Sequence, residues 1–576
     1  MKLNEKHFWF LGFTAAFAAL AGFVFWGTWS TDFAPVMPDC PFVYGPGFAA
    51  GTFRSMFESG RFNPIEFYRF LGSPYFWQEL QYVLGLYGAA LGMAYYCRGR
   101  GLSRLAAYGA GLLLAFSGYW CTLFSAGHLG WFLWMSLGVF AFGLVDRAVR
   151  KGKLRHWLLL GACEAWASGY QTDLWFLFAV FTGAYFIWCC VRERKFPWKG
   201  AVLSAAVFFL VGAPYIRSAF VNDLASRDKQ IEEGQTVSVK DKASVDEREK
   251  RWIFVTNWSL PPAESAEIFI PRINGDTSCP LTLSLGARYG TGVKQYTGAL
   301  GRPKDAPAGN YRQHSLYVGF VTCILALLGV VFAVPSPSRR QALAGEAPLP
   351  RQSPGKQPSE ARQPKAATVR RDVAFFAVAA LLCWLCSMGR YCEPVYRVIF
   401  SLPFGDYLRA PVKWHHLTEL CLVVLAGCGL EGLLGRLGRL GQLGRFASWI
   451  VGVIVLVGAI DLARIDHLYC APVDLREARR QNAGMQMTFL RRSDFSNPQV
   501  AAMVQAKKIV ALAQPNSEMY LVGVLNPRNP QKEKPWPPMG LPTWLGIVSL
   551  VGSLGVAVLV TRSATRNQRG ILGLAL

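Results

Sequence analysis

The feature that most constrains this chain is a series of apolar runs, each about 20 residues long, joined by polar connectors. An α-helix of that length crosses a hydrocarbon core of ~30 Å. About twelve runs therefore predict a polytopic membrane protein whose spans are helices, since helices satisfy their own backbone hydrogen bonds in lipid. The first run is Phe8–Gly27, and the cores of the others are Leu80–Cys97, Leu105–Phe124, Leu129–Val145, Leu154–Ser168, Leu174–Val191, Ala201–Ala219, Leu316–Val334, Val373–Met388, Leu417–Leu434, Trp449–Leu468 and Leu541–Val560.

Charge is distributed unevenly between the connectors. Residues 98–104, 147–155 and 192–199 are rich in Arg and Lys, whereas 125–128 and 168–173 contain neither. Cytoplasmic loops carry the excess of basic residues in membrane proteins. The pattern predicts that both termini are cytoplasmic and that the second set of connectors lies on the outer face. The net charge of +24 then reflects topology, and without a nucleic-acid motif it does not indicate nucleic acid as a partner.

Longer polar segments divide the series of spans. A tract rich in Pro, Ser, Gln and Arg predicts a disordered cytoplasmic linker. The segment that closes the second half carries two stretches, 476–491 and 499–513, which we expect to be helical. The expected parts are a core of seven spans (1–220) with a first outer loop (28–78), an outer segment (221–313), span eight (314–334), the linker (335–371), spans nine to eleven (372–468) with an outer loop (390–414), a second outer segment (469–540), and span twelve with a cytoplasmic tail (541–576).

Several outer-face side chains could carry chemistry. Carboxylates near a bilayer surface lose hydration and can act as bases, and cations can stabilise a departing phosphate. Each has a structural alternative: Asp32 and Asp39 are also common turn residues, and Gln171 with Asp173 suits a helix N-cap. His128 could start a helix, and Arg409 could anchor a lipid headgroup. The candidates are Asp32, Asp39, Arg54, Arg69, His128, Gln171, Asp173 and Arg409.

Other patterns narrow the function. The chain contains no P-loop, no dinucleotide-binding glycine motif, no HExxH and no GxSxG sequence. Few charges fall inside the runs, chiefly Glu164, Glu419 and Asp461, whereas proton-coupled transporters usually bury more. Glycines 85, 88 and 92 predict close helix packing. Five cysteines lie in or beside outer segments (Cys40, Cys121, Cys279, Cys392 and Cys470), and their pairing stays open.

Four patches, taken in order, resemble a known family. They are Asp39 with RFNPIEFYRFLGSPYF, the turn SAGHLGWFLW, the stretch FVTNWSLPPAESAEIFIPRINGD, and FGDYLRAPVKWHHLTELCLVVLAGCGLEGL. Together they resemble the bacterial YfhO-like membrane proteins, of the GT-C class of polytopic glycosyltransferases. The usual Trp before the Asn-Pro pair of the first patch is missing here. The resemblance implies an all-α GT-C-like bundle with outer segments of mixed structure.

The resemblance also implies an activity. It implies transfer of a sugar, with inversion, from a polyprenyl-phosphate donor to an envelope polysaccharide, lipid or protein on the outer face of a bacterial cytoplasmic membrane. The catalytic aspartate would be Asp39, with Asp32 as competitor. Arg409, Arg54, Arg69, His128, Gln171 and Asp173 would bind donor phosphate or substrate. No cofactor is implied, and a divalent cation stays open. The alternatives are a flippase for a lipid-linked glycan and a non-catalytic envelope scaffold.

Overall fold

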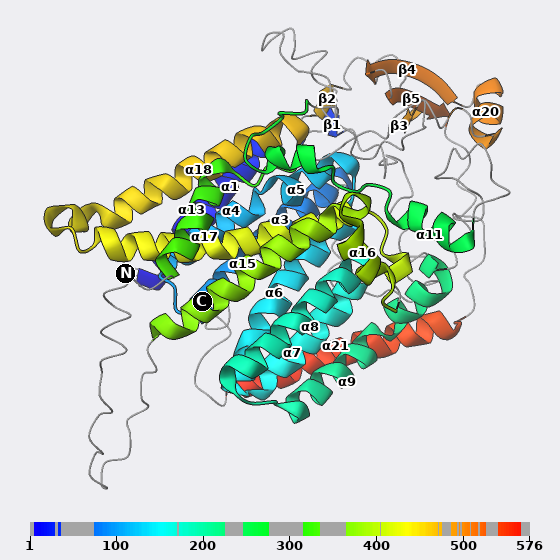
Figure 1. Cartoon of the computed structure of the whole chain (residues 1–576). Coiled ribbons are helices and arrows are strands. Elements are labelled where there is room, and N and C mark those ends of the chain that lie inside the picture. Colours follow the sequence, from blue (N-terminus) through cyan, green and yellow to red (C-terminus); the bar gives the residue numbers. More distant parts are fainter. Residues whose placement is uncertain are drawn as a thin grey trace, which may run out of the picture.

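The computed structural model places a bundle of long helices beside a smaller region that contains strands (Figure 1). It describes residues 5–28, 33–35, 74–169, 172–224, 246–275, 315–333, 365–403, 405–470, 472–474, 485–491, 495, 498–506, 509–516, 519–525 and 539–565. The aspartates and arginines predicted in the first outer loop, 28–78, lie outside these residues.

Each predicted apolar run coincides with a helix. Among the described residues, six helices are long and apolar enough to cross a membrane, or up to seven if the bent pair Arg371–Ser387 and Gly389–Phe400 counts as one span. The chain is therefore a multi-pass membrane protein. The helices are α1 (Glu5–Val24), α3 (Pro74–Gly99), α4 (Arg104–Ala115) with α5 (Gly118–Thr122), α6 (Leu129–Lys151), α7 (Leu154–Ser168), α8 (Thr172–Glu193), α9 (Trp198–Ser218), α13 (Phe320–Ala333), α15 (Lys365–Ser387), α17 (His415–Leu437), α18 (Ala447–Cys470) and α21 (Leu541–Thr565).

Helices α3 and α6 pack closely because α3 presents glycines to its neighbour. A Cβ at Gly85 would lie 2.9 Å from the backbone carbonyl carbon of Phe132, and one at Gly88 would lie 2.0 Å from Ser136 Oγ. A Cβ at Gly92 would meet Phe140 N at 3.1 Å. The predicted role of these glycines in helix packing is confirmed.

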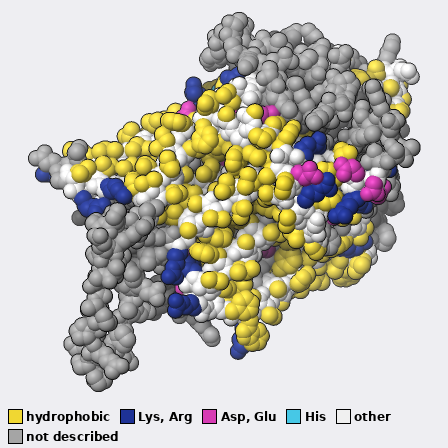
Figure 2. All heavy atoms as spheres, viewed as in Figure 1, with side chains coloured by type: hydrophobic (Ala, Val, Ile, Leu, Met, Phe, Trp, Pro, Cys, Tyr) yellow, Lys and Arg dark blue, Asp and Glu magenta, His cyan; other side chains and the backbone are white. Residues whose placement is uncertain are grey.

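The bundle has two chemically different ends. A broad band of apolar side chains covers the face seen in Figure 2, with Lys and Arg at one end and both charge signs at the other. We name the end that holds connectors 98–104, 147–155 and 192–199 the basic end. The first residue of α1 and the last residue of α21 lie there too, while the strands lie at the opposite end (Figure 1).

A buried ion network closes the basic end. Asp146 Oδ1 accepts from Arg100 at 2.9 Å and from Arg192 at 2.7 Å, and Asp372 Oδ1 accepts from Arg192 at 2.6 Å. Arg100 also pairs with Asp372. Burial alone would raise the pKa of Asp146, but the surrounding guanidinium groups, which include Arg150, outweigh burial and lower it. The network joins α6, α8, α15 and the α3–α4 connector.

The segment after α15 bends away from the bundle. The 3-10 turn Gly389–Cys392 leads into α16 (Glu393–Phe400), and the segment Gly389–Phe400 is bent by 114° relative to Arg371–Ser387. Helix α16 buries Tyr396 and Phe400 and exposes Val398 together with Arg397. This is the pattern of a helix that lies along an interface.

Strands at the opposite end correct part of the sequence reading. Strands β3 (Met485–Arg491), β4 (Ile509–Asn516) and β5 (Met519–Leu525) form an antiparallel sheet in the order β3-β5-β4. The helices expected at 476–491 and 499–513 are therefore wrong where β3 and β4 lie, and α20 (Pro498–Gln505) is the helix that the described residues of these stretches contain. Long-range pairing with β5 prevails over local helical preference.

Two further boundaries follow from the described residues. Helix α15 begins at Lys365, so residues 365–371 of the predicted linker are helical. Strand β1 (Phe33–Pro35), early in the first outer loop, pairs with β2 (Pro472–Asp474) just after α18. This pairing fixes the start of the loop, from Phe33 onward, at the end of the bundle opposite the basic end.

Candidate functional site

Three backbone segments converge at the opposite end of the bundle. Ala410 N donates to Val255 O, and Val412 N donates to Trp258 O, both at 3.1 Å. Leu260 N donates to Ser387 O at 2.9 Å. These bonds join the end of α11 (Glu247–Val255), the end of α15 and the 3-10 turn Pro411–Trp414, so that they form one rigid platform.

The platform contains unusual backbone conformations. Trp258 has φ +62° and Ala410 has φ +64°, a region that side chains with a Cβ rarely adopt. Gly389 has φ +48°, and a Cβ there would lie 2.1 Å from Ser259 Oγ. Such conformations persist only where surrounding contacts hold them, and they cluster at functional sites.

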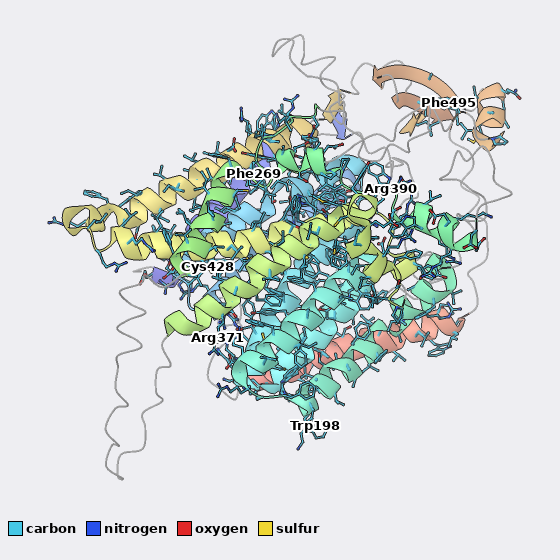
Figure 3. All side chains as sticks on the ribbon, in the orientation of Figure 1. Trp198, Phe269, Arg371, Arg390, Cys428 and Phe495 are labelled. Atoms are coloured by element: carbon cyan, nitrogen blue, oxygen red, sulfur yellow. The ribbon has the colours of Figure 1, made fainter. Side chains whose placement is uncertain are left out.

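Arg390 is the cation that this platform fixes most firmly. Its backbone N donates to Ser259 Oγ at 3.1 Å, and its Nε donates to Thr256 O at 3.1 Å. Within the described part of the chain no carboxylate pairs with its guanidinium. Burial lowers the pKa of Arg390, with Tyr391 acting in the opposite direction. A half-buried guanidinium whose terminal nitrogens have no carboxylate partner among the described residues favours an anion such as phosphate. Figure 3 labels Arg390 near the end of α15.

Lys413, on the same platform, connects two of the predicted residues. Its ammonium pairs with Asp173 at the start of α8, and lies 5.3 Å from the centre of the Trp131 ring. The ring of Trp131 in turn stacks on His128 at 5.0 Å. Asp173 thus pairs with Lys413 directly, whereas His128 is linked to the same lysine through the ring of Trp131.

A buried histidine pair, His415 and His416, follows Lys413 after one residue, Trp414. The ring of His416 stacks on Tyr119 with centroids 4.0 Å apart and planes 2° apart, and Trp120 and Trp131 lie edge-on to it at 5.8 and 5.4 Å. Neither ring nitrogen of His416 has a hydrogen-bond partner among the described residues, although its side chain is fully buried. A buried polar group without a partner is costly and calls for a functional reason.

Glu419 lies one helical turn further. Its Oε1 accepts from the backbone N of Tyr119 at 3.2 Å and lies 3.5 Å from His415 Nε2. His415 Nε2 also lies 3.2 Å from Leu316 O. Glu419 Oε2 has no hydrogen-bond partner in the described part of the chain. An imidazole beside a carboxylate is an arrangement that can transfer protons.

The structure places three of the eight predicted site residues. His128 and Asp173 gather around Lys413, and the guanidinium of Arg409 lies 5.0 Å from the centre of the Phe254 ring, beside the platform. Leu174 N donates to Asp173 Oδ1 at 2.8 Å, so Asp173 also supports the start of α8. The other five, Asp32, Asp39, Arg54, Arg69 and Gln171, lie outside the described residues.

Sequence reasoning missed Arg390, Lys413, His415 and His416 as site residues. Arg390 stands in a loop that was recognised as outer, and the pair His415-His416 opens an apolar run, where two histidines are unusual. Asp466 was also missed as an intramembrane charge; its carboxyl is fully buried, and neither oxygen has a hydrogen-bond partner among the described residues. The position of Asp466 within the predicted span Trp449–Leu468 was the sequence feature that could have indicated it.

In the described part of the chain, no group of three or more His, Cys, Asp and Glu side chains is arranged to hold a metal ion. Cys121, Cys392 and Cys470 form no disulfide with another described residue, while Cys40 and Cys279 lie outside the described residues. Comparisons of the chain with protein-family models, with curated proteins and with solved structures found no match.

Proposed function

We propose that the protein is a membrane glycosyltransferase of the GT-C class, and that its site is the end of the bundle opposite the basic end, on the outer face. The donor is a sugar linked to polyprenyl phosphate, and the acceptor is a component of the envelope. The observation that carries the proposal is Arg390, a half-buried cation held by Thr256 O, with no carboxylate partner among the described residues.

Each part of the site has a role in this proposal. The guanidinium of Arg390 binds the donor phosphate and stabilises the charge that develops there as the glycosidic bond breaks. Arg409 and Lys413 add positive potential beside it. Asp39, with Asp32 as competitor, takes the proton from the acceptor hydroxyl.

The flippase alternative is less well supported because of the ion network at the basic end. Moving a polar glycan between leaflets would require a polar path through the bundle. At the basic end, such a path would be blocked by the ion pairs that Arg100 and Arg192 form with Asp146 and Asp372. The side chains of the two aspartates are only 1% and 6% exposed. Breaking such a buried network by removing one partner costs about 3–5 kcal/mol. A closed inner end and an anion site at the other favour chemistry on one face.

The test uses purified protein and a panel of polyprenyl-monophosphate hexoses, with and without divalent cations. Replacing Arg390 by Ala should lower kcat/KM about 100-fold, the scale of losing one charge-stabilising donor. Arg390→Lys should recover part of the loss. The matched control is Arg397→Ala, because Arg397 lies one helix away but pairs with exposed Glu393. Equal activity of the Arg390→Ala and wild-type proteins would overturn the role of Arg390.

A further inference from the structure

A cavity of about 280 Å³ lies between α7, α8 and α9, far along the chain from the platform. It is open on one side. The apolar side chains Val180 and Ile187 of α8 and Val202 of α9 are exposed on the same helices, as lipid-facing residues are. Lining residues include Trp157, Ala179, Gly183, Ala201, Ala205 and Phe208. The cavity is therefore a lateral groove within the apolar band.

Of the polar residues that line this mainly apolar groove, Glu164 and Thr182 carry side-chain oxygens without a hydrogen-bond partner among the described residues. Trp175 Nε1 donates to Glu164 Oε2 at 3.0 Å, whereas Glu164 Oε1 has no hydrogen-bond partner among the described residues. The hydroxyl of Thr182, 6% exposed, also has none there. Leaving a buried polar group unpaired costs about 1–3 kcal/mol. A ligand with hydrogen-bond acceptors would remove that cost, because a carboxylic acid and a hydroxyl can both donate.

Small residues create the room. A Cβ built at Gly183 would meet no atom within 4 Å, so the space beside it is open. Gly161 differs, because a Cβ there would lie 2.3 Å from Ser204 O. The absence of a side chain at Gly161 therefore allows α7 to pack closely against α9. The volume is slightly below the ~300 Å³ at which sites for whole small molecules begin, so it suits a segment of a chain.

We propose that this groove binds one acyl chain of a diacyl phospholipid, with its ester carbonyl accepting hydrogen bonds from Glu164 and Thr182. The ester region of such a lipid carries acceptors and no donors, which matches the two donors in the groove. An isoprenoid chain has no polar atoms along its length and would leave both groups unpaired. The site is therefore distinct from the proposed donor site and does not depend on the proposed activity.

The experiment is photolabelling in vesicles of phosphatidylethanolamine and phosphatidylglycerol. The probe is phosphatidylcholine with a diazirine in one acyl chain, and labelled peptides are identified by mass spectrometry. Gly183→Leu fills the groove, and labelling of α8 and α9 peptides should fall about tenfold, equivalent to ~1.4 kcal/mol. The matched control is Gly12→Leu on α1, where a Cβ also meets nothing within 4 Å; its labelling should equal that of the wild type.

A second pair of variants tests the hydrogen bonds. Glu164→Gln keeps a donor and should retain labelling, whereas Glu164→Leu removes it and should lose labelling. Both are compared at equal monodispersity on size exclusion. Unchanged labelling in Gly183→Leu, or equal labelling in the two Glu164 variants, would overturn the proposal. Stronger labelling of the groove by a diazirine isoprenoid than by the phospholipid would overturn it as well.

Discussion

At the scale of single residues, the chemistry of the site depends on groups whose polar atoms have no internal partner. His416 is enclosed by Tyr119, Trp120 and Trp131, and none of its ring nitrogens is bonded among the described residues. The guanidinium of Arg390 is similar, since among the described residues its Nε donates to Thr256 O and no carboxylate pairs with it. Leaving buried polar groups without a partner costs free energy, and the proposed function gives a physical reason for retaining them.

Replacing His416 by Phe separates stacking from chemistry. The phenyl ring keeps the contact with Tyr119, and no internal hydrogen bond is lost, so the free energy of unfolding should change by less than about 1.5 kcal/mol. Sugar transfer should fall at least about 100-fold if the nitrogens act on substrate. Thermal unfolding and the transfer assay measure the two effects, and a fully active, stable variant would exclude His416 from the site.

Sequence could predict only part of this site. Residue type and outer location were enough to select His128, Asp173 and Arg409. Arg390 and Lys413 stand out only in the folded structure. Arg390 donates to the backbone carbonyl of Thr256, about 130 positions earlier in the chain, and Lys413 pairs with Asp173. Pairing across such separations leaves no periodic pattern in a single sequence.

At the scale of elements, the bundle depends on how closely α3 approaches α6. The apolar run over α3 was predictable from length and hydropathy alone, and its glycines indicated the packing face. Strand β3 was not predictable in the same way, because its partner β5 lies about 30 residues later and the segment MQMTFLR has no turn signal of its own. Sequence thus predicted helices well and sheet pairing poorly.

Gly85→Val tests the helix contact. The added side chain would meet the Phe132 backbone at about 3 Å, so α3 and α6 must separate, and the melting temperature in detergent should drop by the equivalent of about 1–3 kcal/mol. Gly22→Val on α1 is the control, since a Cβ there meets nothing within 4 Å. Equal melting temperatures for the two variants would contradict the close approach.

At the scale of the whole molecule, the two ends of the bundle differ in their buried polar groups. The ion network of Arg100, Arg192, Asp146 and Asp372 ties four parts of the chain together at the basic end. The platform and the histidine pair occupy the opposite end. The pattern of basic connectors predicted which loops share an end, although it did not predict that buried aspartates would neutralise two of their arginines.

Asp146→Asn should destabilise the whole fold. It leaves Arg100, Arg150 and Arg192 short of a counter-charge, at a cost of about 3–5 kcal/mol. The control, Glu193→Gln, removes a more exposed partner of Arg192 and should cost less than about 1 kcal/mol. Unfolding followed by tryptophan fluorescence measures the free energy of unfolding of both variants. A change of less than about 1 kcal/mol in Asp146→Asn would contradict a stabilising role of the ion network.

The same carboxylate sets a pH dependence. Because the folded pKa of Asp146 lies below its unfolded value of about 3.9, its contribution is complete above that value and is lost as pH falls through the folded pKa. Wild-type stability should therefore fall more steeply below about pH 4 than that of Asp146→Asn. Parallel pH profiles of the two proteins would contradict the lowered pKa.

The most direct test of the account follows one labelled donor in sealed proteoliposomes. A polyprenyl-monophosphate hexose with a radioactive sugar is supplied to one leaflet, with envelope extract as acceptor. The account predicts that label leaves the lipid and joins the acceptor on the face that carries Arg390, and that Asp39→Asn and Arg390→Ala abolish this transfer. Label that stays on the lipid and appears in the other leaflet would contradict it and identify a flippase.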